Sequence, residues 1–120
     1  MTVIVPTFNR AHYLGEALDS LLSQSRVPSE IIVVDDGSTD DTGAVVSAYR
    51  DPVRYIRKEN GGKASAVNVG LAASRGDLIY VFDDDDIAYP DAIEKLLEPL
   101  ERDPSLGFAH GALTHFVVDA

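Results

Sequence analysis

The sequence predicts an α/β fold in which a mostly parallel sheet is flanked by helices. Short apolar, β-branched runs alternate along the chain with stretches whose apolar residues follow helical spacing. Hydrophobic residues make up 45% and charged residues 25% of the 120 residues, which is a globular composition. We therefore expect a single domain over residues 1–120, with right-handed crossovers and ligands at the carboxyl ends of the strands.

Three apolar, β-branched runs are expected to form strands, each stopped by Pro, by Asp-Gly or by a run of Asp, and a fourth, weaker strand is expected at 53–56. Because the three runs are continuously apolar, they are typical of strands buried on both faces, as in a parallel sheet. After Pro104, residues 106–109 and 113–118 suggest two further strands, and the sequence stops just beyond them. We expect from this that the fold is truncated at its C-terminus. The four expected strands are residues 3–5, 31–34, 53–56 and 78–82.

Helices are expected between these strands, because three stretches carry an apolar stripe at intervals of three and four residues. Ser38 to Asp41 offer N-cap side chains, Gly76 follows a helical stretch, and Pro90 with Asp91 can open a helix. The elements then follow in the order βαβαβαβα. The stripes are Leu14, Leu18, Leu21 and Leu22, then Ala64, Val67, Leu71 and Ala72, then Ile93, Leu96, Leu97 and Leu100.

The composition excludes several classes of function. A net charge of -10 would repel nucleic-acid phosphate, and the absence of cysteine excludes disulfides and thiolate chemistry. Residues 1–6 lack the features of an export signal, and no apolar run approaches the ~18 residues of a membrane span. We expect a soluble, cytoplasmic chain, with any attachment to the inner face of a membrane made through segments outside this sequence.

Four consecutive carboxylates, Asp83 to Asp86, directly follow the strand expected at 78–82. On extended backbone Asp83 and Asp85 point to the same side, so an Asp-x-Asp pair would converge at a strand end. Mg²⁺ or Mn²⁺ binds oxygen ligands, often one or two carboxylates completed by phosphate and water, and would neutralise a departing diphosphate. The alternative is that these residues cap the helix that begins near Pro90.

A second acidic point, Asp35-Asp36-Gly37-Ser38, follows the strand at 31–34. A carboxylate there could accept a hydrogen bond from a base or a ribose, whereas the alternative is simple turn chemistry. In residues 60–63, Asn-Gly-Gly-Lys, backbone N–H groups and the Lys63 ammonium could face an anion at a helix N-terminus. This loop does not satisfy the P-loop pattern, and no G-x-G-x-x-G follows the first strand.

The remaining polar and aromatic residues carry no recognisable site pattern. The histidines lack metal-binding spacing and are interpreted as structural or surface residues, the arginines as solvated charges rather than substrate ligands, and the tyrosines as packing residues. These residues are His12, His110 and His115, then Arg54, Arg57 and Arg75, then Tyr13, Tyr49 and Tyr80.

Taken together, residues 3–10 (VIVPTFNR), 32–40 (IVVDDGSTD), 60–63 (NGGK) and 83–86 (DDDD) resemble, in order and approximate spacing, the family 2 glycosyltransferases. The resemblance runs from residue 2 to about residue 110. It implies a Rossmann-like GT-A fold, of which this chain would be the part that binds a nucleotide sugar. It also implies that Mn²⁺ or Mg²⁺ holds a nucleoside diphosphate sugar, with a UDP-sugar expected at family level.

The resemblance also assigns roles to individual residues. Pro6 and Thr7 would lie beside the base, and Asp36 would bond it. Asp83 would lie near the ribose or donor sugar and contribute to the metal site, with Asp85 as the principal metal ligand. Lys63 and Asn68 would lie near the diphosphate or sugar. Asp84 stands where many relatives have a small or apolar residue, so Asp84 is either a ligand or a bystander.

The resemblance implies inverting transfer of the sugar to an acceptor hydroxyl, on a glycan, a lipid carrier or a protein. That chemistry needs a general base, and no residue after Asp91 fills the role. A non-catalytic nucleotide-sugar-binding module is therefore the alternative. A third interpretation, a phosphate-accepting receiver domain built on Asp35 and Asp36, is disfavoured by the Asp run at 83–86.

Overall fold

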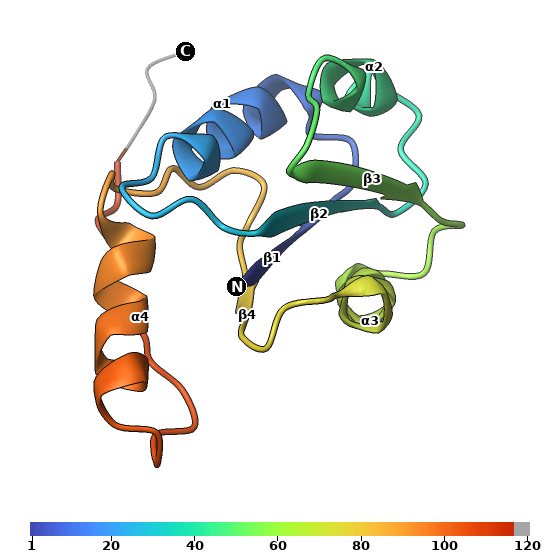
Figure 1. Ribbon diagram of the computed structural model, residues 1–120. Helices are drawn as coiled ribbons and strands as arrows, with labels where there is room; N and C mark the ends of the chain where they lie inside the picture. The colour runs from blue at the N-terminus through green and yellow to red at the C-terminus, as the bar shows by residue number, and fades with distance from the viewer. Residues whose placement is uncertain (117–120) are drawn as a thin grey trace.

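The computed structural model describes residues 1–116 and contains a four-stranded, entirely parallel sheet flanked by helices, which confirms the predicted α/β class (Figure 1). The order of elements is the predicted one. They are β1 (Thr2–Thr7), α1 (Ala11–Leu22), β2 (Glu30–Asp35), α2 (Thr42–Ser47), β3 (Val53–Arg57), α3 (Lys63–Ala73), β4 (Ile79–Val81) and α4 (Ala92–Arg102).

The strand order β3-β2-β1-β4 places a change of direction in the middle of the sheet. From β1 the chain steps outward to β2 and then β3, and afterwards crosses back to pair β4 with the opposite edge of β1. Right-handed crossovers then require α1 and α2 on one face and α3 on the other, as Figure 1 shows. The crossovers through α1 and α3 therefore lie on opposite faces of the sheet. The junction of β1 and β4 is the switch point at which such sheets bind their ligands.

The central strands β1 and β2 are buried on both faces, which explains why they are continuously apolar. The edge strands are not, since Tyr55 of β3 and Ile79 and Val81 of β4 are exposed, so the expectation of burial on both faces is wrong for them. Alternate residues of each strand point to opposite faces, so Val3 and Ile31 pack on the side of α1, whereas Ile4 and Ile32 pack on the side of α3. The face covered by α1 carries the larger cluster, to which Leu14, Leu18, Leu21, Val46, Ile93 and Leu97 contribute.

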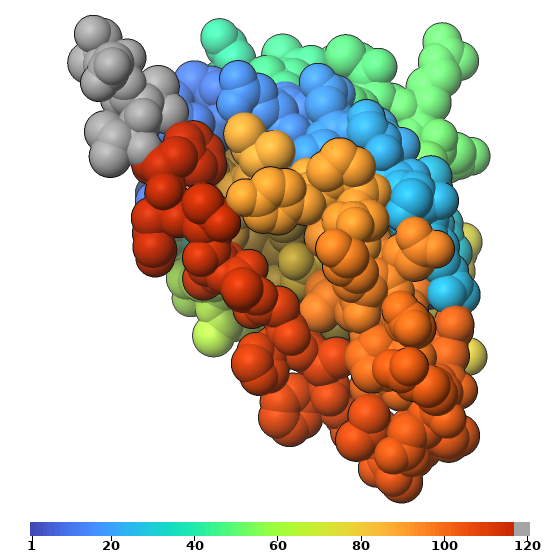
Figure 2. Space-filling model, turned by 90° about the vertical axis from the view of Figure 1, so that its left-hand side faces the viewer, coloured from blue at the N-terminus to red at the C-terminus, as the bar shows by residue number. Residues whose placement is uncertain are grey.

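Helix α4 lies beside the sheet rather than across one of its faces, and Figure 2 views the molecule from that side. Its buried residues, Ile93 and Leu97, join the core on the side of α1. Gln24 fixes the start of the helix, because its side chain accepts a hydrogen bond from the Ile93 N–H at 3.0 Å and donates one to the Tyr89 carbonyl at 2.6 Å. Residues 90 and 91 precede α4, as the Pro90-Asp91 signal predicted.

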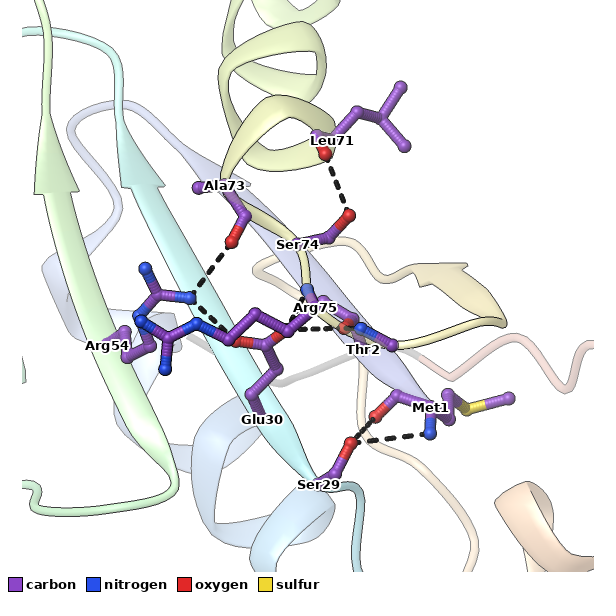
Figure 3. Close-up of polar contacts among 10 residues, drawn as sticks. Met1, Thr2, Ser29, Glu30, Arg54, Leu71, Ala73, Ser74 and Arg75 are labelled. Atoms are coloured by element: carbon purple, nitrogen blue, oxygen red, sulfur yellow. Dashed lines mark hydrogen bonds and ion pairs between the residues drawn. The ribbon is translucent and has the colours of Figure 1, made fainter.

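A buried carboxylate, Glu30, organises the amino end of the sheet, as the close-up in Figure 3 shows. It accepts hydrogen bonds from Thr2 Oγ1 at 2.7 Å, from Arg54 Nη1 at 2.6 Å and from the Arg75 N–H at 2.5 Å. Desolvation raises the pKa of Glu30, but these bonds outweigh it and lower the pKa to about 2. The interpretation of Arg54 as a solvated charge is therefore wrong, because Arg54 pairs with a buried carboxylate.

The strands expected after Pro104 do not form within the described residues, which end at 116. Residues 106–109 and 113–116 are irregular, whereas residues 117 and 118 lie outside the described part of the chain. Phe108 and Leu113 are each 78% exposed, so no neighbouring strand offers these segments a ladder of hydrogen bonds. The strand expected at 78–82 is also shorter, since β4 covers only Ile79–Val81.

Within residues 1–116, no helix has both the length and the apolar character needed to cross a membrane.

Candidate nucleotide and metal site

A cavity of about 400 Å³ lies at the carboxyl edge of the sheet, at the switch point between β1 and β4. The end of β1, the loop after β2, the first turn of α3 and the loop after β4 all contribute to it. Six of the seven predicted site residues share this cavity. Its lining is Pro6, Thr7, Phe8, Arg10, Asp36, Lys63, Ala66, Asp83, Asp84 and Asp85.

Asn68 is the predicted residue that does not line the cavity. It is exposed on α3, two residues beyond Ala66, which does line the cavity. The sequence resemblance placed Asn68 near the diphosphate together with Lys63. In the structure only Lys63, at the start of α3, lies at that edge.

The premise that Asp83 and Asp85 stand on extended backbone is wrong. Strand β4 ends at Val81, and the chain turns at once, with the Asp86 N–H donating to the Asp83 carbonyl at 3.2 Å. The turn sends the side chains to different partners. Lys63 Nζ donates to Asp83 at 2.5 Å, and Arg10 Nη1 donates to Asp85 at 2.6 Å.

Asp84 is the buried member of the run and the one whose role the sequence left open. It is 7% exposed and accepts a hydrogen bond from Thr7 Oγ1 at 2.8 Å, so it ties the end of β1 to the loop after β4. Desolvation raises its pKa, against the Thr7 hydrogen bond and the Arg10 charge 3.7 Å away. Burial at the junction of two strands is a property of the fold that the sequence pattern does not reveal.

Negative charge exceeds positive charge around this turn. Among residues 1–116, the four carboxylates of the run have two cationic partners: Arg10 pairs with Asp84 and Asp85, and Lys63 pairs with Asp83. Burial, followed by repulsion from Asp83 and Asp85, raises the pKa of Asp86, and the hydrogen bond to Asp83 raises the pKa of Lys63. Four carboxylates against two cations leave an excess of two negative charges.

The chemistry of these residues fits a hard divalent cation, since every candidate ligand in the turn is a carboxylate oxygen. In the described part of the chain, no three His, Cys, Asp or Glu side chains gather closely enough to hold a metal by themselves. A cation here would be held by one or two carboxylates, with the remaining ligands supplied by a phosphorylated ligand and by water. That arrangement is common for Mg²⁺.

Asp36 is held by the loop that precedes α3. Its carboxylate accepts hydrogen bonds from Lys58 Nζ at 2.8 Å, Gly61 N–H at 2.9 Å and Gly62 N–H at 2.8 Å. The Lys58 bond, with the two backbone bonds, lowers its pKa despite burial. The expectation that these backbone N–H groups face an external anion is therefore wrong, because they bind Asp36. Gly62 adopts φ 95, a conformation that favours glycine.

Turn chemistry accounts for Asp35. The Ser38 N–H donates to its carboxylate at 2.8 Å, and the Tyr55 hydroxyl donates to its other oxygen at 2.5 Å. Ser38 Oγ in turn accepts from the Asn9 N–H at 2.9 Å, so the loops after β1 and β2 are joined. Both carboxylates of the Asp35–Asp36 pair are thus engaged within the protein.

A second cavity, of about 740 Å³, adjoins the first. His12, His115 and Tyr13 contribute to it, so two of the three histidines line a hollow, whereas His110 is exposed. Tyr13 remains 41% exposed.

Other residues without an expected site role have partners within the protein. Tyr49 and Tyr80 pack against the core, and the Tyr49 hydroxyl donates to Asp19 at 2.8 Å. Arg57 donates to the Ser38 carbonyl at 3.0 Å.

Comparison with known proteins gives one family. The model of "Glycosyl transferase family 2" matches residues 2–118. An uncharacterized glycosyltransferase of Rickettsia prowazekii is 40% identical over 102 residues, which are 85% of this chain and 32% of that protein. The glycosyltransferase GlyG of Streptococcus pneumoniae is 38% identical over 106 residues, which are 85% of this chain and 35% of that protein. The chain spans about a third of the length of these relatives.

Solved structures of GT-A glycosyltransferases have the same fold, as predicted. The mannosyltransferase PcManGT of Pyrobaculum calidifontis, in complex with GDP-Man and Mn²⁺, has a TM-score of 0.80 and is 34% identical over 88% of this chain and 33% of that one. TarS of S. aureus, in complex with UDP-GlcNAc, has a TM-score of 0.77 and is 32% identical over 84% of this chain and 31% of that one.

Proposed function

This chain belongs to glycosyl transferase family 2, and from that premise we propose that its cavity binds the nucleoside diphosphate of a sugar donor together with Mn²⁺ or Mg²⁺. The observation that carries the proposal is the excess of two negative charges at the turn after β4. The turn lies in a cavity at the topological switch point of the sheet, where α/β proteins bind their ligands.

The roles that the resemblance implies are proposed for the residues that line the cavity. Pro6 and Thr7, at the end of β1, lie beside the base, and Asp36 closes that side as an acceptor whose geometry is fixed by the loop before α3. Lys63 lies at the other side of the cavity, and its side chain is 63% exposed, so its ammonium can move from Asp83 to a phosphate oxygen. Because an exposed ion pair contributes only about 0–1 kcal/mol, exchanging Asp83 for a phosphate costs little.

The metal site is proposed at Asp85 and Asp83, with the buried Asp84 as a third candidate. A bound divalent cation would neutralise charge on the diphosphate leaving group. The protein's own contribution is to fix the carboxylates: Asp84 is held by Thr7, and the turn is closed by the Asp86 N–H. The donor is proposed to be a UDP-sugar, and the transfer to be inverting, to a hydroxyl of a glycan, a lipid carrier or a protein.

Nucleotide binding without turnover is the second candidate for this chain alone. Inverting transfer needs a base to deprotonate the acceptor hydroxyl. Among residues 92–116, no carboxylate lines either cavity, and the acidic residues that do are Glu16, Asp36 and the Asp83–Asp86 run.

Single-domain organisation over 1–120 and a cytoplasmic location both stay predictions. A receiver-type phosphorylation site at Asp35 and Asp36 is disfavoured, because both carboxylates are engaged by protein donors.

Calorimetric titration of UDP and of GDP, with Mn²⁺ or with a chelator, tests the proposal. We expect binding that needs the metal and is lost in Asp85→Asn, with Asp77→Asn, a carboxylate outside the cavity, as the matched control. Silence with both nucleotides in the presence of Mn²⁺ would contradict the proposal. Added donor sugar and candidate acceptors then distinguish transfer from binding alone.

A further inference from the structure

Arg10 is a cavity residue to which neither the sequence motifs nor the resemblance gave a role. It stands between β1 and α1, at the N-terminal boundary of the helix. Its Nη1 atom donates to Asp85 Oδ2 at 2.6 Å and lies 3.7 Å from Asp84 Oδ1. One guanidinium nitrogen therefore faces oxygens of two neighbouring carboxylates, which is where a cation bridging them would also lie.

The ion pair also stands on the boundary between the two cavities. Arg10 and Asp85 are the residues that line both of them. On the first side lie Thr7, Lys63 and Asp83, and on the second lie Glu16 and Asp86.

The ion pair between Arg10 and Asp85 is weak enough for another cation to replace Arg10. The side chains of Arg10 and Asp85 are 48% and 42% exposed, so their mutual attraction is screened by water. The second carboxylate is different, because the Asp84 side chain is only 9% exposed and is held by Thr7. A half-exposed cationic side chain thus faces one fixed and one exposed carboxylate, and a divalent cation of higher charge density can take its place.

We propose that Arg10 is an internal counter-cation that competes with the divalent metal for Asp85 and Asp84. When the metal binds, the guanidinium leaves these carboxylates and, still at the edge of the same cavity, turns to an oxygen of the nucleoside diphosphate. Arg10 thereby couples the two ligands: it opposes the metal alone and favours the metal together with the diphosphate. The inference rests on the proposed function and adds a positioning residue to it.

The test measures Mn²⁺ affinity without nucleotide, by the electron paramagnetic resonance signal of free Mn²⁺ at fixed ionic strength. Arg10→Gln removes the charge and keeps a polar side chain, whereas Arg10→Lys keeps the charge. Arg50→Gln makes the same change in net charge at an exposed arginine outside both cavities. We expect Arg10→Gln to bind Mn²⁺ about fivefold more tightly, since an exposed pair contributes up to about 1 kcal/mol. Arg10→Lys and Arg50→Gln should stay near wild type.

A second titration, of UDP at saturating Mn²⁺, should show the opposite effect, with affinity about fivefold weaker in Arg10→Gln and unchanged in Arg50→Gln, because one exposed charge pair with the diphosphate is lost. If Arg10→Gln binds Mn²⁺ as the wild type does, or more weakly, the competition is refuted while the proposed function stands. If neither protein binds Mn²⁺ or nucleotide, the proposed function fails and the inference with it. Tighter Mn²⁺ binding in Arg50→Gln as well would reduce the effect to overall charge and overturn the role of Arg10.

Discussion

Replacing Asp36 by Asn should destabilise the protein, because the carboxylate is a structural anchor before it meets any ligand. It is 4% exposed and accepts three hydrogen bonds, from Lys58 and from the N–H groups of Gly61 and Gly62. An amide keeps one acceptor oxygen but turns an NH₂ group toward a donor, and it leaves Lys58, whose side chain is 16% exposed, without its carboxylate partner. Since a hydrogen bond to a charged group contributes about 1.5–3 kcal/mol, we expect a loss of about 3 kcal/mol.

Urea unfolding at pH 7 measures this loss, and Asp77→Asn, a carboxylate near the other end of the sheet, is the matched control. The lowered pKa of Asp36 fixes the pH dependence: its contribution is present above the ordinary value of 3.8 and is lost as pH falls below it, so the variant and the wild type should converge in acid. Amide exchange at Gly61 and Gly62 should also accelerate. A loss below about 1 kcal/mol, with both amides still protected, would refute the anchoring role.

Three further changes test the scaffold around the site. Glu30→Gln should lower the free energy of unfolding by about 1–2 kcal/mol at pH 7, which is less than the full pKa shift of Glu30 implies, because solvent screens its partner Arg54. The wild type should lose this extra stability as pH falls from 4.5 to about 2. Urea midpoints measured across that pH range test this. Gly70→Ala should cost about 1–3 kcal/mol by thermal unfolding, because its Cβ would lie 2.6 Å from Ile4 Cγ2, whereas Gly107→Ala meets nothing within 4 Å and should be neutral. Tyr55→Phe removes a hydroxyl donor to the carboxylate of Asp35, at the end of β2, and should lower the free energy of unfolding by about 1 kcal/mol. An unchanged midpoint of urea unfolding would contradict this prediction.

Periodicity and punctuation predicted the order of the eight elements in residues 1–116. They did not predict the buried face of α3, whose buried residues are Ala66 and Gly70 rather than the expected stripe through Leu71. The buried runs of β1 and β2 and the leucine stripe of α1 are local signals that the tertiary structure reinforces. The segments after Pro104 show the limit of this reasoning, because an apolar run forms a strand only where a neighbour offers hydrogen bonds. Leu113 and Phe108 have the composition of a strand, but in the described structure they remain exposed.

Residue type and position at a strand end were enough to predict which residues gather at the cavity, but not which hydrogen-bond partner each of them has. The ends of parallel strands meet at one edge, so the sequence alone was enough to group Thr7, Asp36 and Asp83. Which donor each carboxylate accepts depends on loop conformation. Lys58 could not be found in this way because it binds Asp36 from across a turn, and the burial of Asp84 depends on the pairing of β4 with β1.

Two acidic motifs that look equivalent in the sequence have different electrostatic roles in the fold. At Asp36 the protein supplies its own donors, and the pKa falls, which marks a carboxylate already neutralised by its surroundings. At Asp84 and Asp86 burial raises the pKa, repulsion between neighbouring carboxylates adds to it, and the cations in reach are half-exposed side chains. The first motif is therefore complete without a ligand, whereas the second is stabilised by added positive charge. The same difference explains why we expect Asp36→Asn to act first on stability and Asp85→Asn to act first on metal-dependent binding.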